Sequence, residues 1–256
     1  MQHSEARYPS RPMNLWKAWK AFRGLVGDRN DTRYVFEFFE NVNGRSYETY
    51  YDEFLSSDYG REIVHDFRSV GRFLSDRKTL ESYGPGTFAA AYLKHMDANG
   101  FTAEGVFEAS LAQAPERMKY LQDNFPDLYA INYMGSVTHD MYHVLSGYGA
   151  DPLGEALLLV YSAQMSSSRG ANWLGRLAGL QIRSEIPAWP VGRMMDEAVR
   201  NARNAVKFHT VDLTSYMHLP IDEARAELKV DRAALYEKTL AEWDGPMPVP
   251  PQAEAA

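Results

Sequence analysis

Apolar residues recur along most of the chain at intervals of three and four, which is the period of amphipathic α-helices. Turn-forming residues interrupt this pattern, as at Asn43-Gly44 and at Gly84-Pro85-Gly86. Residues typical of β-strands occur only in isolated stretches such as Val211 to Leu213. The pattern therefore predicts an all-α fold, organised as a single helical domain of about ten helices.

The predicted domain covers residues 14–244. We expect the polar residues 1–13 to be loose, and the tail rich in Pro and Ala, residues 245–256, to be disordered. Within the domain, long periodic stretches predict continuous helices over residues 61–74 and 128–145.

The first predicted helix, residues 14–26, has an apolar side and a basic side. The apolar side is made of Leu15, Trp16, Trp19, Phe22 and Val26, and the basic side is made of Lys17, Lys20 and Arg23. A short basic amphipathic helix with two tryptophans suits an anionic membrane surface. The alternative is an ordinary helix that packs its tryptophans on the body of the protein.

The strongest chemical signal lies where the helix over residues 128–145 ends and a glycine-rich turn follows. His139 and His143 are four residues apart, so on a helix both imidazoles project from one face, with Asp140 beside them. After the turn, Asp151 can cap a second helix whose first turn contains Glu155. This αα-hairpin predicts a divalent-metal site formed by His139, Asp140, His143 and Glu155.

Two alternatives to this metal site remain open at the level of sequence. Asp140 either binds the ion or orients a histidine that does. Without any ion, the two histidines would be partly buried and bonded to backbone and to Asp140, and Glu155 would complement a helix dipole.

Composition narrows the chemistry of such a site. The 256 residues include no cysteine, so any metal must bind to His, Asp, Glu or water. The net charge of -7 argues against a nucleic-acid partner. No apolar run is long enough to span a bilayer, and the N-terminus lacks the apolar segment of a secretory signal. We therefore expect a cytoplasmic protein that is soluble or peripheral to a membrane.

The spacing His139-Asp140-x-x-His143, eleven residues, Glu155 resembles the signature of a known family. That family is the coenzyme Q (ubiquinone) biosynthesis family of the fourth Coq protein. Residues 86–92 resemble its Gly-Thr-x-Gly-x-x-Tyr segment, and residues 221–228 resemble its segment ending in Arg-x-x-Leu. The chain departs from the family at residues 133–138, where members often have Arg-Tyr-Arg-Glu before the His-Asp pair.

The resemblance implies an α-helical protein of ubiquinone synthesis that is peripheral on the inner face of a membrane. It implies metal-dependent C1 decarboxylation and hydroxylation of a prenylated ring derived from 4-hydroxybenzoate, with His139, Asp140, His143 and Glu155 as the metal-binding and catalytic residues. Zn²⁺ is the first candidate ion, and Fe, Mn and Mg are alternatives. Expected partners are the prenylated aromatic lipid, other ubiquinone biosynthesis proteins, the membrane surface and, as a further option, a second copy of the chain.

Two other functions fit the same residues. One is a non-catalytic, lipid-binding scaffold that organises the ubiquinone biosynthetic enzymes. The other is a metallo-phosphohydrolase, which would need His65-Asp66 and Asp196 to join the His-Asp doublet.

Overall fold

The computed structural model describes residues 12–27 and 33–248. Within these residues the chain forms sixteen α-helices, two short 3₁₀-helices and no β-strand, which confirms the all-α class. The helices outnumber the predicted ten, and part of the difference arises because two long predicted helices are each divided. Residues 61–74 fall in α4 (Asp58–Ile63) and α5 (Arg68–Ser75). Residues 1–11 and 249–256, most of the two segments expected to be loose or disordered, lie outside the described residues.

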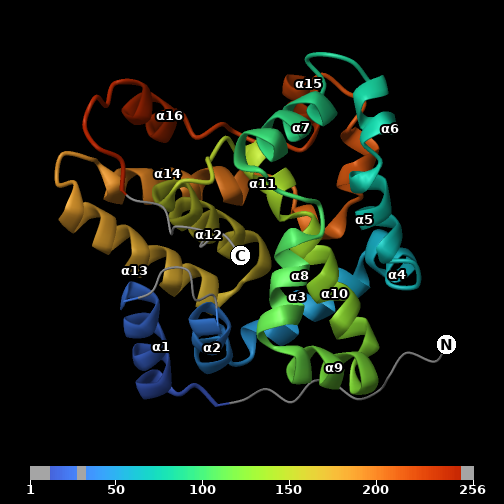
Figure 1. Cartoon of the computed structure of the whole chain (residues 1–256), viewed down its shortest axis with the longest axis horizontal. Helices are drawn as coiled ribbons and strands as arrows, with labels where there is room; N and C mark the ends of the chain where they lie inside the picture. Colours follow the sequence, from blue (N-terminus) through green and yellow to red (C-terminus); the bar gives the residue numbers. More distant parts are fainter. Residues whose placement is uncertain (1–11, 28–32, 249–256) are drawn as a thin grey trace. The chain divides into compact units, whose positions relative to one another are not determined.

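The chain divides into two compact units that interleave along the sequence. Among the described residues, unit 1 comprises residues 48–145 and 206–230. Its remaining helices are α3 (Ser46–Ser56), α6 (Arg77–Ser82), α7 (Phe88–Asn99), α8 (Gly105–Gln113), α9 (Pro115–Asn124), α10 (Pro126–Val137), α11 (His139–Ser146), η1 (Phe208–Thr210), η2 (Leu213–Tyr216) and α15 (Ile221–Glu227). Unit 2 contains α1 (Leu15–Gly27), α2 (Arg33–Val42), α12 (Pro152–Ser166), α13 (Arg169–Glu185), α14 (Val191–Asn204) and α16 (Ala234–Ala241), as labelled in Figure 1.

Aromatic side chains form much of the core of unit 1. Helix α10 packs against α5, α8 and α9, and its Tyr133 is fully buried. The Tyr133 ring meets the edge of Phe107, with ring centroids 4.8 Å apart, and that of Phe67, at 5.1 Å. Edge-to-face pairs stabilise packing beyond the gain from apolar burial, so this cluster fixes the position of α10. Helix α11 follows α10 directly, so its start is fixed as well.

The start of α7 is joined to the segment that precedes α15. Thr87 caps α7 by accepting a hydrogen bond from the Ala90 amide. The Phe88 amide donates to the Leu219 carbonyl (2.8 Å), and the Ile221 amide donates to the Gly86 carbonyl (3.1 Å). Gly86 has a φ of 82°, a left-handed conformation that glycine adopts without strain. Two segments separated by about 130 residues along the sequence are thereby held side by side.

Helix α12 is the centre of unit 2 and packs against both α13 and α14. The predicted cap is present, since the Asp151 carboxylate accepts hydrogen bonds from the Leu153 and Gly154 amides. Helix α13 approaches α12 closely at Gly175, where an added Cβ would lie 2.6 Å from the Ala156 carbonyl oxygen. A larger residue at position 175 would therefore force the two helices apart.

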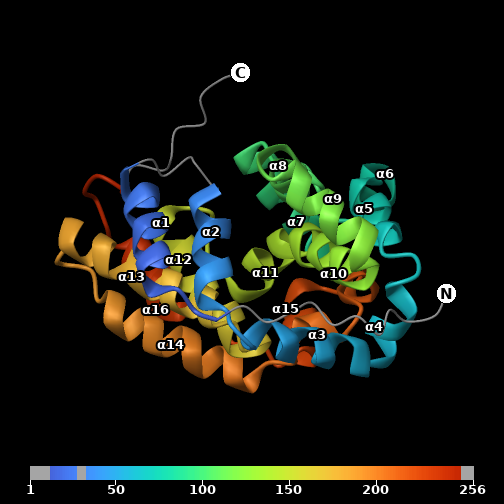
Figure 2. The ribbon, with the colours of Figure 1, turned by 90° about the horizontal axis from the view of Figure 1, so that it is seen from below.

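Helices α1 and α2 lie side by side in unit 2, and both pack against α13 (Figure 2). Their shared core contains Ala18 and Ala21 from α1. The tryptophans of α1 face away from it, because Trp16 is 66% exposed and Trp19 is 49% exposed. The alternative in which both tryptophans pack on the body of the protein is therefore wrong. No helix among the described residues has the length and apolar character needed to cross a bilayer.

Candidate metal centre

His139 and Asp140 lie in the first turn of a new helix, α11, and not in the last turns of a long one. The predicted continuous helix over residues 128–145 is wrong because it is divided at Thr138. The Thr138 hydroxyl donates to the Met134 carbonyl (2.8 Å), and the Met141 amide then bonds to the Thr138 carbonyl three residues back (3.1 Å). A threonine bonded to the preceding turn in this way bends helices. The bend leaves Asp140 in a first turn, where the helix dipole favours a carboxylate.

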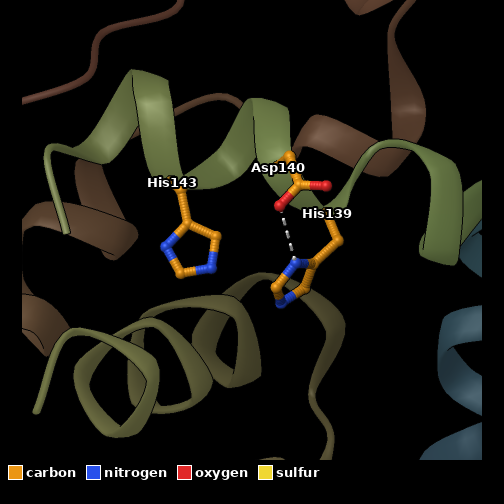
Figure 3. Close-up of side chains that lie close together, drawn as sticks. All are labelled: His139, Asp140 and His143. Carbon is orange, nitrogen blue, oxygen red and sulfur yellow. Dashed lines mark ion pairs between the residues drawn. The ribbon is translucent and has the colours of Figure 1, made fainter. Parts of the chain in front are cut away.

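The three residues of the motif converge. His139, Asp140 and His143 each offer one ligand atom, and these atoms all lie within 4.8 Å of one another. Figure 3 shows the two imidazoles projecting from the same side of α11, with the Asp140 carboxylate beside His139. The His139 Nδ1 is 3.6 Å from the Asp140 Oδ1, and the two imidazole rings cross at 71°. The predicted geometry of one helical face is therefore present.

Burial within the group is uneven. His143 and Asp140 are buried, whereas a third of the His139 side chain remains exposed. Solvent can therefore reach the group from the side of His139.

Helix α7 supplies two further side chains to this group. The His95 Nε2 lies 3.4 Å from the Asp140 Oδ1, and its ring stacks on His143 with centroids 5.3 Å apart. Tyr92, one turn earlier on α7, is buried, and the pKa of its phenol is raised first by burial and then by the Asp140 charge. The Asp140 carboxylate is thus surrounded by three imidazoles and a phenol from two helices.

These neighbours keep the carboxylate ionised. Burial alone raises the pKa of the Asp140 carboxyl, but contacts from His139 and His95 and the influence of His143 outweigh it. The net pKa of Asp140 lies well below its usual range. A buried anion held ready in this way is a strong attractor for a cation.

Arg225 fixes the far end of α11. Its Nε donates to the Leu145 carbonyl (3.0 Å) and its Nη2 to the Val144 carbonyl (2.9 Å), while its Nη1 pairs with Asp222 (2.9 Å). The last carbonyls of a helix have no intrahelical partner, so a guanidinium at this point caps α11. The helix that bears the three converging residues is therefore anchored to α15.

Glu155 is described with unit 2. It lies in the first turn of α12, whose cap residue Asp151 also accepts a hydrogen bond from the Tyr236 hydroxyl. The same tyrosine hydroxyl accepts a hydrogen bond from the Gly149 amide (3.0 Å), so the turn before α12 is tied down. Glu155 is thus on a well-anchored helix start.

The donor set fits a divalent ion. Two imidazole nitrogens and one carboxylate oxygen are ligands that Zn²⁺, Fe²⁺ and Mn²⁺ all accept, and three protein ligands leave room for water or substrate. His139, Asp140 and His143 would hold the ion, and the fit depends on their convergence within 4.8 Å. Asp66, which a phosphohydrolase would need near the ion, instead pairs with Arg72 at 2.9 Å in an exposed position.

Comparison with known families shows to which family the chain belongs. Residues 18–234 match the family described as coenzyme Q (ubiquinone) biosynthesis protein Coq4. The chain belongs to this family. The Coq4 match includes all three segments whose resemblance was noted from sequence.

A solved structure has the same fold. It is that of a candidate ubiquinone biosynthesis protein from Nostoc punctiforme PCC 73102, with a TM-score of 0.58 and 17% sequence identity. The alignment covers 86% of this chain and 99% of that one. No curated protein matches the sequence at a significant level.

In unit 1 two of the Coq4-like segments support the part of the third that forms α11. The segment at residues 86–92 begins α7, and the segment at residues 221–228 forms α15, which anchors α11 through Arg225. The sequence motif alone indicated no role for Arg225 or His95. A usable signal existed for His95, because it lies one turn after the buried Tyr92 and next to the buried Met96, at the edge of the apolar face of its helix.

Proposed function

We propose that this Coq4 family protein performs metal-dependent C1 decarboxylation and hydroxylation of a prenylated, 4-hydroxybenzoate-derived ring at a membrane surface. The observation that supports this most is the convergence of His139, Asp140 and His143 around a buried, ionised carboxylate. Membership of the family makes ubiquinone synthesis the pathway in which such a site would act.

His139, Asp140 and His143 would hold the ion from α11, and Glu155 would complete the set from the start of α12. A bound divalent ion would supply Lewis acidity toward the carboxylate and phenol oxygens of the ring. The residues themselves would orient the ring, with the exposed edge of His139 as the side from which substrate enters. Burial of His143 and Asp140 would exclude water from the carbon that loses its carboxylate.

The reaction has a definite balance. The bond between C1 and the carboxylate breaks and releases CO₂, and a C–O bond forms at the same carbon. Dioxygen supplies the hydroxyl oxygen, and its second atom leaves as water after taking up two electrons and two protons from a cellular two-electron reductant.

The test is lipid analysis of a strain that lacks the protein. We expect no ubiquinone and accumulation of a prenylated ring that still bears its C1 carboxylate, measured by mass spectrometry of extracted lipids. Complementation with wild type should restore ubiquinone, whereas Glu155→Ala should not, although the folded protein persists. A first-turn glutamate contributes only about 0.3–1 kcal/mol to folding through the helix dipole.

Each alternative result has its own meaning. Normal ubiquinone in the deletion strain would reject the pathway, and accumulation of an already decarboxylated ring would reject the step. Full rescue by Glu155→Ala would favour a scaffold that organises other biosynthetic enzymes.

Two helices of unit 2 support the membrane part of the proposal. Helix α1 exposes Leu15, Trp16 and Trp19 among Lys17, Lys20 and Arg23 and contains no acidic residue. From Arg169 to Arg183 the exposed positions of α13 alternate between basic and apolar residues at helical spacing, in the order Arg169, Trp173, Arg176, Leu180 and Arg183, and the exposed Ser184 and Glu185 end the helix. The two helices begin at the same corner of the unit, since Nη1 of Arg169 lies 4.0 Å from Sδ of Met13.

This basic and aromatic surface contrasts with the charge of -7 on the whole chain. An anionic bilayer offers both phosphate charges and an interface that suits tryptophan.

Vesicle binding tests this surface. The double variant Trp16→Ala, Trp19→Ala should bind anionic vesicles at least about tenfold more weakly, because two exposed indoles no longer enter the interface. Flotation with liposomes measures this. Tyr120→Ala is the matched control, because Tyr120 is an aromatic residue of unit 1 that is also 49% exposed. Equal losses in both variants would show that the membrane contact is not specific to α1.

A further inference from the structure

His95 is not part of the motif that predicted the metal site, yet it lies against two of its members. It stands on the buried side of α7, and its side chain is only 13% exposed. Its ring is stacked on His143 at 22° and meets the edge of Phe101 at 6.0 Å. The ring is thereby held in one place by packing alone.

The polar end of this ring faces Asp140. The His95 Nε2 is buried, and within the described residues it makes no hydrogen bond of ordinary geometry. The group it approaches is the Asp140 Oδ1, at 3.4 Å. A buried donor or acceptor without a partner destabilises a protein. A small shift of either side chain would bring the His95 imidazole and the Asp140 carboxylate into hydrogen-bond geometry.

We propose that His95 is a positioning residue for the metal site: it donates a hydrogen bond from Nε2 to the Asp140 Oδ1 and fixes the rotation of that carboxylate toward the ion. This inference rests on the proposed function, because it assumes that His139, Asp140 and His143 bind a divalent ion. Carboxylates that bind metals are commonly held by such outer partners, which set both orientation and affinity.

The ring geometry argues against His95 as a ligand in its own right. An imidazole lone pair lies in the plane of its ring, and the planes of His95 and His143 are nearly parallel, at 22°. Because these two rings are stacked face to face, an ion in the plane of the His143 ring lies outside the plane of the His95 ring. His139 and His143 cross at 71°, so their planes do meet.

Metal binding to the purified full-length protein, freed of metal, tests the proposal without any assay of activity. Zn²⁺ affinity is measured by competition with a chelator, and Co²⁺ serves as a spectroscopic probe of ligand geometry. His95→Phe keeps an aromatic ring against His143 and removes the donor, and we expect a loss of about 10–100-fold in affinity with an altered Co²⁺ spectrum. His95→Gln places an amide donor near the same point and should recover most of the affinity.

The matched control is His209→Phe. His209 is a second buried histidine of unit 1, and its Nε2 lies 3.3 Å from the Glu53 carboxylate. This variant should bind Zn²⁺ as tightly as wild type. Far-ultraviolet circular dichroism of each metal-free variant shows that the fold is retained.

A double-mutant cycle shows whether His95 acts through Asp140. In an Asp140→Asn background, His95→Phe should cause no further loss of affinity. An equal further loss would overturn the positioning role, as would failure of His95→Gln to recover affinity. Wild-type affinity in a folded His95→Phe would reject the inference and leave the metal site intact, whereas a wild type that binds no metal would reject the proposed function itself.

Discussion

Unit 1 contains two pairs of a histidine and a carboxylate with nearly equal separations, one buried at Asp140 and one partly buried at Glu53. The His95 Nε2 is 3.4 Å from Asp140, and the His209 Nε2 is 3.3 Å from Glu53. Their surroundings differ. At Glu53 the second carboxylate oxygen accepts from Lys207 at 2.7 Å, so the negative charge already has a cation of the protein. At Asp140 the surrounding groups are imidazoles and a phenol.

The difference shows which pair is suited to a ligand. Burial, together with the charge of Lys207, lowers the pKa of His209 to about 4 against the opposing attraction of Glu53. That pair is a closed unit in which Lys207 neutralises Glu53. Around Asp140 the pKa of the carboxyl is instead held low by imidazoles, which are also metal ligands when neutral. A histidine and a carboxylate at the same separation therefore stabilise the fold at Glu53, whereas at Asp140 the carboxylate is suited to bind an ion.

The largest expected effect separates the two pairs by metal content. Wild type should carry about one divalent ion per chain. His143→Ala removes one of three converging donors and should release the ion, a greater loss than the roughly 10–100-fold caused by removing an outer partner. His209→Ala should retain it. Elemental analysis of the purified proteins measures the metal content. Full metal occupancy in both His139→Ala and His143→Ala would show that the ion does not bind at Asp140.

A smaller effect is expected from the anchor of α11. Arg225→Ala deletes two charged hydrogen bonds to the last carbonyls of the helix and should lower the free energy of unfolding by about 2–4 kcal/mol. It should also weaken Zn²⁺ binding, because the helix that bears the donors loses its fixed end. Arg225→Lys keeps the charge but not the planar fork, so it should recover only part of both. Urea denaturation and chelator competition measure the two effects, and an unchanged Zn²⁺ affinity in Arg225→Ala would show that α11 holds its own position.

Local features were predictable where one residue determines one conformation. The Thr87 and Asp151 caps follow from side-chain oxygens that reach the amides of the next turn, and both are present. The pair His139 and His143 was predictable because helical spacing alone places both rings on one face. None of these features requires knowledge of what the helix packs against.

The remaining features depended on contacts between distant segments. The division at Thr138 depends on a hydroxyl that could equally have faced solvent, so periodicity alone favoured a continuous helix. The approach of His95 to Asp140 and of Arg225 to α11 joins residues 45 and 80 positions apart. A pattern of apolar spacing places a side chain on a face, but it does not say which other face will meet it.

The smallest effect concerns how the closed pair responds to acid. The pKa of His209 is about 4 in the folded protein, below the ordinary value of 6.5. Between these two values the unfolded chain binds a proton that the folded chain does not. Stability from this group is therefore complete above pH 6.5 and is lost as the pH falls toward 4. We expect the loss to be about 1–3 kcal/mol, because a pKa difference of one between the folded and unfolded chain corresponds to about 1.4 kcal/mol.

Urea denaturation at a series of pH values between 7 and 4, on wild type and His209→Phe, measures this contribution as a difference in slope. His209→Phe lacks the titrating group, so its free energy of unfolding should fall less steeply with acid, whatever its absolute stability. Titrating groups distant from His209 are common to both proteins and cancel in the comparison. If the free energy of unfolding falls equally steeply in both proteins, Glu53 stabilises a proton on His209 in the folded state. The two pairs would then differ less than the comparison with Asp140 implies.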